Sequence, residues 1–241
     1  MALEQQGANP ERSKGPTPLL WAVERGHETI VKMLLERDDT NPNAADVHGR
    51  TPLFIAASKG CERVVEMLLE RKDVNPNTAN RSGEAPLFPA VHEGHEGVLK
   101  LLLERPDVNP NTTNVYGQTP LFRAAFKGHE GVVKVLLERN DVDPNAGGEG
   151  RQTPLYIAAQ KGHERVVKIL LERLEINPNI TDLAGETAFS QALEREHYAI
   201  AKLLSEHRNF NLQLYFNGLT IHSPPWRSGL DQGHPKRIRR F

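Results

Sequence analysis

The sequence is short of the residues that build disulfides, membrane spans and secretion signals. Its one cysteine is Cys61, so no disulfide can form within the chain, and a reducing, intracellular compartment is expected. No apolar run approaches the ~18 residues of a membrane-spanning helix. Residues 1–16 are polar and charged, unlike a secretion signal. These features predict a protein of the cytoplasm, with the nucleus as the alternative, and no membrane partner.

Aromatic residues and net charge are also scarce. Aromatic side chains make up 6% of the residues and hydrophobic side chains 38%, which is lean for one large core but typical of thin stacked units. The 30 Lys and Arg residues are balanced by 31 Asp and Glu residues, for a formal net charge of −1. Because so balanced a chain exerts no general attraction on nucleic acid, composition does not predict a nucleic-acid partner.

The sequence does contain a strong internal repeat. The triplet Thr-Pro-Leu, or a relative of it, recurs every 34 residues. It begins at Thr17, Thr51, Ala85, Thr119, Thr153 and Thr187. Gly-His or a relative follows nine residues after each start, then an apolar run, and the first five units continue into Asn-Pro-Asn or Asp-Pro-Asn. Six units in constant phase indicate a repeat array rather than a single core.

Each unit is predicted to form two short helices and an extended loop, as residues 51–84 illustrate. Thr51 can cap the first helix, Pro52 occupies its first position, and Gly60 ends it. The second helix is predicted over residues 62–70, where apolar side chains fill one face. Pro76 then forces the chain into a loop. Because so short a helix pair cannot bury its apolar face alone, we predict an all-α solenoid of about six units.

The units share the consensus T-P-L-x-x-A-A-x-x-G-H-E-x-V-V-K-x-L-L-E, which resembles the ankyrin repeat over roughly residues 17–204. The sequence -LLER-x-DVNPN- leading into the loops, together with Phe or Tyr after Thr-Pro-Leu, is similar to repeat arrays common in filamentous fungi. The resemblance implies helix-turn-helix units with projecting finger loops and a role in binding protein partners. The 34-residue period and the loss of the family histidine after Thr-Pro-Leu depart from the family, so the finger geometry is not carried over in detail.

Three units depart from the common pattern. The sixth lacks the proline, the glycine and the loop, as expected of a terminal cap. The third unit has Ala85 in place of a capping threonine, and Pro89 is expected to remove an early helix hydrogen bond. The fourth unit has its turn glycine shifted to Gly150, so we expect a more mobile finger there.

Three regions are predicted along the chain. Residues 1–16 form a disordered arm, residues 17–209 the repeat domain and residues 210–241 a non-repeat, flexible tail. Within the tail, Leu212–Phe216 is expected to pack on the last unit. The tail ends in the basic cluster Lys236–Arg240, which leaves a nucleic-acid contact open beside the simpler interpretation of a solvated terminus.

No constellation in the sequence predicts catalysis. His-Glu recurs in four units, at His27, His95, His129 and His163. A zinc-protease helix needs a second histidine four residues on, and those positions are Val or Leu. The histidines are instead predicted to make structural hydrogen bonds at the turn between the helices. Cys61 stands at the same position without a neighbouring base to activate it. We therefore expect no enzyme activity, metal, cofactor or small-molecule substrate.

The positions that vary while the scaffold repeats are the candidates for partner binding. They lie on the finger tips and at the ends of the first helices, and hot spots favour aromatic and arginine side chains near the centre of an interface. The predicted central contacts are Tyr116, Arg123, Phe126, Lys127 and His92. The finger tips add His48, Arg81 and Leu183. The alternative is that Phe126 packs on a neighbouring unit and Tyr116 only extends its polar tip into solvent.

The sequence thus predicts a monomeric, non-catalytic module that binds a protein partner as an adaptor, scaffold or inhibitor. Three alternatives stay open: a recognition fragment or paralogue of a larger multidomain signalling protein, a nucleic-acid-associated regulator that uses the basic tail, and an enzyme with an unrecognised site. Repeat arrays bind many unrelated targets, so the fold does not name the partner.

Overall fold

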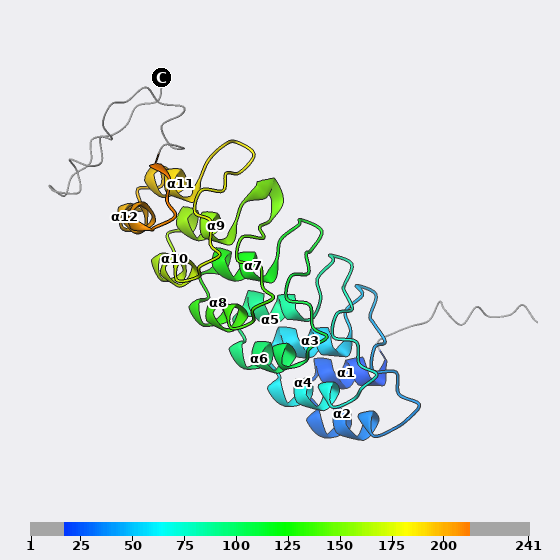
Figure 1. The fold of residues 1–241 in the computed structure, drawn as a ribbon. Coiled ribbons are helices and arrows are strands. Elements are labelled where there is room, and N and C mark those ends of the chain that lie inside the picture. Colours follow the sequence, from blue (N-terminus) through cyan, green and yellow to red (C-terminus); the bar gives the residue numbers. More distant parts are fainter. Residues whose placement is uncertain (1–16, 213–241) are drawn as a thin grey trace, which may run out of the picture.

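The computed structural model describes residues 17–212, in which the chain forms six pairs of short helices (Figure 1). The first helices of the pairs are α1 (Pro18–Glu24), α3 (Pro52–Lys59), α5 (Leu87–Glu93), α7 (Pro120–Lys127), α9 (Pro154–Lys161) and α11 (Ala188–Glu194). The second helices are α2 (Glu28–Leu35), α4 (Glu62–Leu69), α6 (Glu96–Glu104), α8 (Glu130–Leu137), α10 (Glu164–Leu171) and α12 (Tyr198–Glu206). A short 3-10 turn, η1 (Glu149–Arg151), lies between α8 and α9. None of the helices in this part of the chain has the length and apolar character to cross a bilayer.

The helices stack into an elongated solenoid of two layers, which confirms the predicted all-α architecture (Figure 1). The first helices form one row and the second helices the other. Each helix packs on the equivalent helix of the next unit, as α3 packs on both α1 and α5. The loops between units project from the row of first helices as fingers (Figure 1). One hydrophobic core runs through the units, because the buried face of each helix pair meets its neighbours.

The ends of the first helices follow from the repeated triplet and glycine. In α3 the Thr51 hydroxyl accepts a hydrogen bond from the Phe54 N–H at 3.2 Å, and this caps the helix. Pro52 occupies the first helical position, where a missing N–H costs no intrahelical bond. Gly60 ends the helix in the left-handed region at φ 70°.

The third unit has the weak helix start that its sequence predicts. Ala85 has no hydroxyl to act as a cap, and α5 begins only at Leu87. The Phe88 N–H donates to the Ala85 carbonyl at 2.9 Å, in the tighter i,i+3 pattern. Because Pro89 has no N–H, the longer i,i+4 bond to that carbonyl cannot form, so the predicted loss of one early bond is confirmed.

Histidines join the third, fourth and fifth units to the unit before each of them. The Nε2 atom of His95 lies 3.2 Å from the Ser58 carbonyl oxygen of the preceding first helix. His129 and His163 make the equivalent contact at 3.1 Å, which confirms the predicted structural role at these three positions. The glycine that ends the first helix leaves room for the imidazole, since a Cβ at Gly60 would lie 2.7 Å from the His95 ring.

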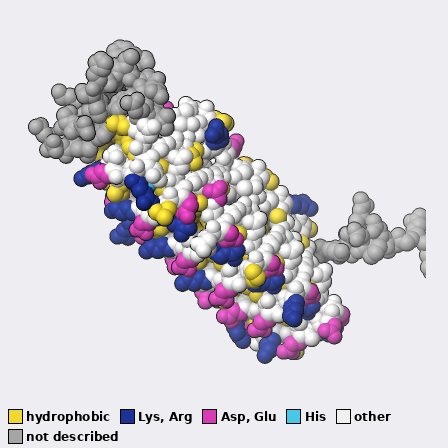
Figure 2. All heavy atoms as spheres, in the orientation of Figure 1, with side chains coloured by type: hydrophobic (Ala, Val, Ile, Leu, Met, Phe, Trp, Pro, Cys, Tyr) yellow, Lys and Arg dark blue, Asp and Glu magenta, His cyan; other side chains and the backbone are white. Residues whose placement is uncertain are grey.

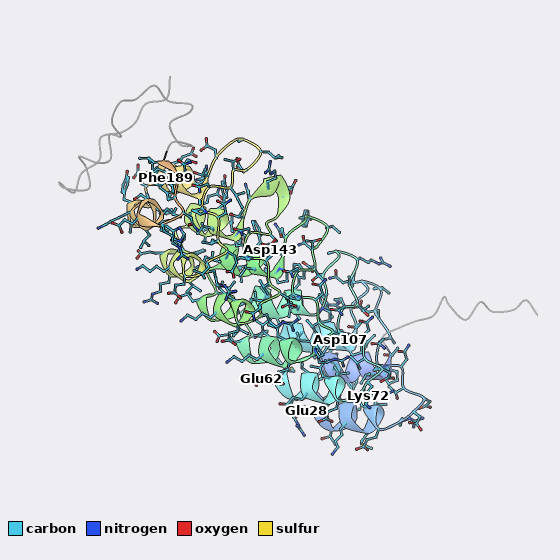
Figure 3. The ribbon with its side chains drawn as sticks, in the orientation of Figure 1. Glu28, Glu62, Lys72, Asp107, Asp143 and Phe189 are labelled. Carbon is cyan, nitrogen blue, oxygen red and sulfur yellow. The ribbon has the colours of Figure 1, made fainter. Side chains whose placement is uncertain are left out.

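Asparagines in the loops make a second connection between units. The Asn77 side chain reaches the next loop, where Nδ2 donates to the Asp107 carbonyl at 2.6 Å and Oδ1 accepts from the Asn109 N–H at 3.1 Å (Figure 3 labels Asp107). Within its own loop, the Asn77 N–H donates to Asn75 Oδ1 at 2.9 Å. The same bridge starts from Asn43, Asn111, Asn145 and Asn179. The Asn-Pro-Asn loop therefore also holds neighbouring units together through hydrogen bonds.

An arginine after the second helix makes a third connection. Arg71 donates from Nη1 to the Leu35 carbonyl of the preceding unit at 3.0 Å, and its Nη2 pairs with Asp73 Oδ2 at 2.6 Å. A cation suits this place because the carbonyls at the end of a helix carry partial negative charge. Arg139 and Arg173 make the equivalent carbonyl contact in their units.

The fingers are joined at their tips by backbone hydrogen bonds. Five finger tips are described: residues 46–50, 80–84, 114–118, 148–152 and 182–186. Three of the four pairs of neighbouring tips are bonded. These bonds run from the Arg81 N–H to the His48 carbonyl at 3.0 Å, from the Val115 N–H to the Ser82 carbonyl at 2.9 Å and from the Leu183 N–H to the Gly150 carbonyl at 3.0 Å.

The row of tips is interrupted between the third and fourth fingers. The equivalent bond would join the Glu149 N–H to the Tyr116 carbonyl, and it is absent from the backbone hydrogen bonds of the described residues. The fourth tip turns differently, because Arg151 occupies the position that is glycine in the other four. Arg151 has a left-handed φ of 63°, and Gly150 before it has φ 71°. A left-handed backbone costs a residue other than glycine roughly 1–2 kcal/mol.

The chain that follows α12 packs on the last unit, as the loops of the inner units do on theirs. The Phe210 ring lies 4.9 Å from the Phe189 ring, and Leu212 packs against the same core. Of the segment predicted to pack here, Leu212–Phe216, only Leu212 falls within the described residues. The predicted arm of residues 1–16 and the rest of the tail, with its basic cluster, lie outside them and stay predictions.

Candidate protein-binding surface

Four of the predicted binding residues lie on finger tips: His48, Arg81, Tyr116 and Leu183. All four are exposed, Tyr116 at 60% and Leu183 at 76%. Val115, which the sequence hypothesis did not select, is 64% exposed on the same tip as Tyr116. The tip turns hold the backbone in place, so these side chains are presented without a loop that must be ordered on binding.

The other predicted residues gather near the ends of α5 and α7. The half-buried Phe126 ring lies between two cations, with Arg123 Cζ at 5.7 Å and Lys161 Nζ at 4.7 Å from its centroid. Cations within about 6 Å of a ring face are attracted by its quadrupole, for about 0.5–1 kcal/mol at exposed sites. Lys161 belongs to α9, so this cluster spans two units. The sequence signal for Lys161 is the 34-residue period, because Lys161 occupies in α9 the position that Lys127 occupies in α7.

A charged pair lies at the end of α5 beside this cluster. His92 Nδ1 is 2.8 Å from Glu93 Oε1. The pKa of Glu93 is lowered, first by this hydrogen bond and further by the nearby charge of exposed Lys127. The His92 carbonyl accepts the bond from His129 of the next unit, so its backbone belongs to the scaffold while its side chain reaches the surface.

The structure separates the predicted central residues into two places. Tyr116 lies on a finger tip, and no hydrogen bond, ion pair or ring contact reported for the described residues joins it to Arg123 or Phe126. Phe126 also packs against the hydrophobic core, and its carbonyl accepts from His163 Nε2 at 3.1 Å. The ring therefore has a packing role in addition to its surface exposure, which leaves both interpretations of this residue in place.

The opposite layer of the solenoid is a solvated surface of mixed charge. On the face shown in Figure 2, basic and acidic side chains intermix along the row of second helices. Lys168 Nζ pairs there with Glu164 Oε1 at 2.6 Å. Exposed pairs of this kind contribute little to stability. Their even mixture offers no surface of one sign to a partner, so the finger side is the stronger candidate.

The chemistry available on the described residues is that of ion pairs and hydrogen bonds. Within residues 17–212, no group of three or more His, Cys, Asp or Glu side chains is arranged to hold a metal ion. An open depression between α8 and α10 is lined largely by charged side chains, among them Glu130 and Arg165, which lie 3.5 Å apart. Cys61 is half-buried against the core. An open, salt-bridged surface resembles a contact region more than a water-excluded reaction site.

Comparison with known proteins agrees with this geometry. A family model described as ankyrin repeats (3 copies) matches residues 1–80, 72–147 and 141–214. The chain belongs to the ankyrin repeat family. The crystal structure of the ankyrin repeat protein EF0377 is similar to it at 27% sequence identity with a TM-score of 0.76, covering 83% of this chain and 100% of that one. No curated protein matches the chain.

Ankyrin repeats are generally protein-protein interaction modules and typically have no catalytic site. One departure from the ankyrin pattern has a structural reason. Tyr156 takes the place of the family histidine in the fifth unit, and its hydroxyl donates to Asp182 Oδ2 at 2.8 Å. Burial, followed by this hydrogen bond, raises the pKa of the Tyr156 hydroxyl. The tyrosine thus connects α9 to the tip of the following finger.

Proposed function

We propose that this ankyrin array is a non-catalytic module that binds a protein partner along its finger tips and the ends of α5, α7 and α9, as an adaptor, scaffold or inhibitor. The observation that carries the proposal is the Phe126 ring, which is half-buried near the middle of the stack between Arg123 and Lys161. An aromatic ring flanked by cations suits a partner that presents an apolar side chain beside carboxylates.

The finger tips support the same surface. Tyr116 and Leu183 expose large side chains on turns whose backbones are hydrogen-bonded. Because those turns are already ordered, binding loses little conformational entropy in the array. The tips and the helix ends project from the same row of first helices, so an extended partner segment can contact both (Figure 1).

The test compares capture of partners by the intact chain and by a variant with Tyr116→Ala, Arg123→Ala and Phe126→Ala. In a lysate of the source organism, we expect a protein that the intact chain enriches and the variant captures at least about tenfold less, as the loss of central contacts implies. Helix content and thermal unfolding of the variant are measured first.

The matched control places three alanines on the second helices, at Lys32, Lys100 and Lys134, and is expected to capture the same protein as the intact chain. Equal capture by the intact chain and the central variant would contradict the proposed surface. Phe126→Ala alone separates its two roles. If it lowers stability but leaves the affinity of the folded fraction unchanged, Phe126 serves packing and not the partner.

A further inference from the structure

A row of positive charge follows the ends of the first helices. The position at the end of each first helix is basic and exposed in five of the six units. These five residues form the cation row: Arg25, Lys59, Lys127, Lys161 and Arg195. The exception is Glu93 in the third unit. Because the position recurs every 34 residues, the cation row runs along the stacked first helices, on the side of the array that bears the fingers (Figure 1).

The preference of helix ends for cations does not explain this row. The carboxyl end of a helix favours a cation, because its last carbonyls carry partial negative charge. That preference alone would place cations at the ends of the second helices as well. Four of the six second helices are instead followed by a glutamate: Glu36, Glu70, Glu138 and Glu172. The cations are therefore a property of the first-helix side and not of helix ends in general.

The charge of the cation row is not neutralised by ion pairs. None of the ion pairs within residues 17–212 joins a member of the row to a carboxylate. Lys127 lies near enough to Glu93 to lower the pKa of that carboxyl, but Glu93 forms its hydrogen bond with His92, at 2.8 Å. By contrast, Arg71 after a second helix and Lys168 within one are both paired. The row thus offers its charge to a partner.

Further cations widen the row near the middle of the array. Arg123 and Lys161 lie beside the Phe126 ring, with Cζ at 5.7 Å and Nζ at 4.7 Å from its centroid. Neither α7 nor α9 contains an acidic residue. Arg81 is exposed on the second finger tip and forms no ion pair within the described residues. Cations around one apolar ring suit carboxylates that flank an apolar side chain.

The spacing of the row selects a backbone conformation for the partner. Packed helices lie about 8–10 Å apart, which sets the step from one unit to the next. In a polyproline II segment every third residue returns to the same side after about 9 Å, since each residue rises about 3.1 Å. A β-strand returns to the same side after about 7 Å or about 13 Å. A polyproline II segment therefore matches the array with one acidic side chain for each unit.

We infer that the cation row binds an acidic partner segment in the polyproline II conformation, which presents a carboxylate at every third residue. The inference rests on the proposed function, because it names the partner class of the same face. Lys127 and Lys161 bind successive carboxylates, and an apolar residue between them contacts Phe126. Glu93 repels a carboxylate at the third unit, so the segment carries a neutral or basic residue there. A preformed polyproline II segment also loses little conformational entropy on binding.

The test measures the affinity of two synthetic peptides for the full chain by isothermal calorimetry at low salt. The spaced probe is four copies of Glu-Leu-Pro, with both ends blocked so that they carry no charge. The clustered probe has the same composition, with its four glutamates placed together. We expect the spaced probe to bind at least about tenfold more tightly, because its carboxylates match the step between units. Its affinity is expected to fall as salt is added.

Variants of the full chain locate the site. Lys127→Glu with Lys161→Glu is expected to weaken binding of the spaced probe at least about tenfold. The matched control, Lys100→Glu with Lys134→Glu, makes the same change of charge at exposed positions of the second helices and is expected to bind as the natural chain does. Glu93→Lys completes the row and is expected to strengthen binding of the spaced probe about threefold or more.

Circular dichroism and thermal unfolding verify that each variant is folded. If the double variant of the row does not fold, the two probes on the natural chain and the effect of Glu93→Lys still decide the outcome. Equal affinity for the spaced and clustered probes would overturn the inference, because charge alone and not its spacing would then explain binding. Equal weakening by the two double variants would also overturn it, since the cation row would not be the site.

Two further outcomes separate this inference from its alternatives. Tighter binding of a single-stranded oligonucleotide of equal charge than of the spaced probe would assign the row to nucleic acid and overturn the inference. If the spaced probe does not bind while the variant Tyr116→Ala, Arg123→Ala and Phe126→Ala still loses the partner captured from the lysate, the acidic segment is wrong and the proposed function stands. Loss of both results would overturn both.

Discussion

A single asparagine side chain in each loop ties one unit to the next. Asn77 uses both ends of its amide, donating to the Asp107 carbonyl and accepting from the Asn109 N–H. A primary amide suits this position because it offers a donor and an acceptor on one short, flat group. An aspartate of the same shape only accepts hydrogen bonds when ionised, so it would face the Asp107 carbonyl without a proton to share.

We expect Asn77→Ala to lower the free energy of unfolding by about 1–2 kcal/mol, because two hydrogen bonds between units are lost. Asn77→Asp should lower it at least as much. Urea denaturation followed by circular dichroism measures both. The control is Asn140→Ala, at an exposed loop asparagine, with an expected change within about 0.5 kcal/mol. An Asn77→Ala variant as stable as this control would refute a contribution of the bridge to stability.

Pairs of arginine and aspartate give the fold a pH dependence of defined sign. Hydrogen bonds from Arg71 and Arg105 lower the pKa values of Asp73 and Asp107 below the usual 3.8. A folded-state pKa below that of the unfolded chain means that the stabilisation is present above the unfolded pKa and is lost as the pH falls through the folded one. Both carboxylates are about half exposed, so each pair contributes only a few tenths of a kcal/mol.

The double variant Asp73→Asn with Asp107→Asn is therefore expected to be less stable than the natural chain at pH 7, and the difference is expected to shrink as the pH falls from the unfolded pKa of about 3.9 through the lowered folded-state pKa values of the two carboxylates. Urea titrations at a series of pH values measure the difference. A stability difference that stays constant across that range would contradict the role of the two carboxylates.

Some of these residue roles were predictable from the sequence and others were not. Pro76 excludes helix and its neighbouring asparagines favour turns, so the loop follows from local preference. The bridge from Asn77 depends on a second loop lying within hydrogen-bonding distance, and that distance is set by how the helix pairs stack. Lys161 illustrates the same limit, because its contact with Phe126 crosses from one unit to the next.

At the scale of the helix pair, the interface between the first two units lacks the histidine contact that His95, His129 and His163 make. Cys61 stands at the position of His95, with nearly the same backbone, φ −80° and ψ 78° against φ −79° and ψ 79°. A Cβ at Gly60 would lie 2.7 Å from the His95 ring, whereas one at Gly26, opposite Cys61, would meet nothing within 4 Å. The space for an imidazole is therefore present between α1 and α3.

We expect Cys61→His to raise the free energy of unfolding by about 1 kcal/mol, because the new imidazole can donate to the Glu24 carbonyl as His95 does to that of Ser58. Thermal and urea unfolding of Cys61→His and Cys61→Ala measure the gain against a side chain without a donor. If the histidine variant is no more stable than the alanine variant, the vacant space does not reproduce the inner interfaces.

The helix boundaries were predictable because their signals are local. A capping threonine and a terminal glycine act within a few residues, as Thr51 and Gly60 do for α3. The fourth finger was predicted only in part. The shift of its glycine to Gly150 was visible in the sequence, but the left-handed backbone of Arg151 was not, because a residue other than glycine adopts it only when its surroundings impose it.

At the scale of the whole molecule, the finger tips form two connected groups. Tip-to-tip hydrogen bonds join the first three fingers and, separately, the last two. The helices remain stacked across the interruption, as α7 packs on α9. We expect the Glu149 amide hydrogen to exchange with solvent faster than those of Arg81, Val115 and Leu183, which donate to the neighbouring tip.

Amide exchange followed by nuclear magnetic resonance measures this difference residue by residue. The Asn80 N–H, which donates to the Glu84 carbonyl inside its own tip, serves as the reference for a bond that does not cross between fingers. Protection of Glu149 equal to that of the three bonded tips would contradict the interruption.

The period of the repeat made the architecture predictable, since six units in phase leave stacking as the way to bury their apolar faces. The candidate binding surface was predictable only as a set of variable positions. Its division between Tyr116 on a tip and Phe126 beside the helix ends arises from the lateral offset between fingers and helices, which sequence spacing does not contain.

The asparagine bridges have a consequence for how such an array can change over generations. Each unit offers the same hydrogen-bonding groups to its predecessor and the complementary groups to its successor, so the edges left after removal or duplication of 34 residues in register still match. Unequal recombination between neighbouring units would therefore lengthen or shorten the array by whole 34-residue units, and no interface residue would have to change. The reach of the binding surface can then evolve in steps of one unit, independently of the side chains that give it specificity.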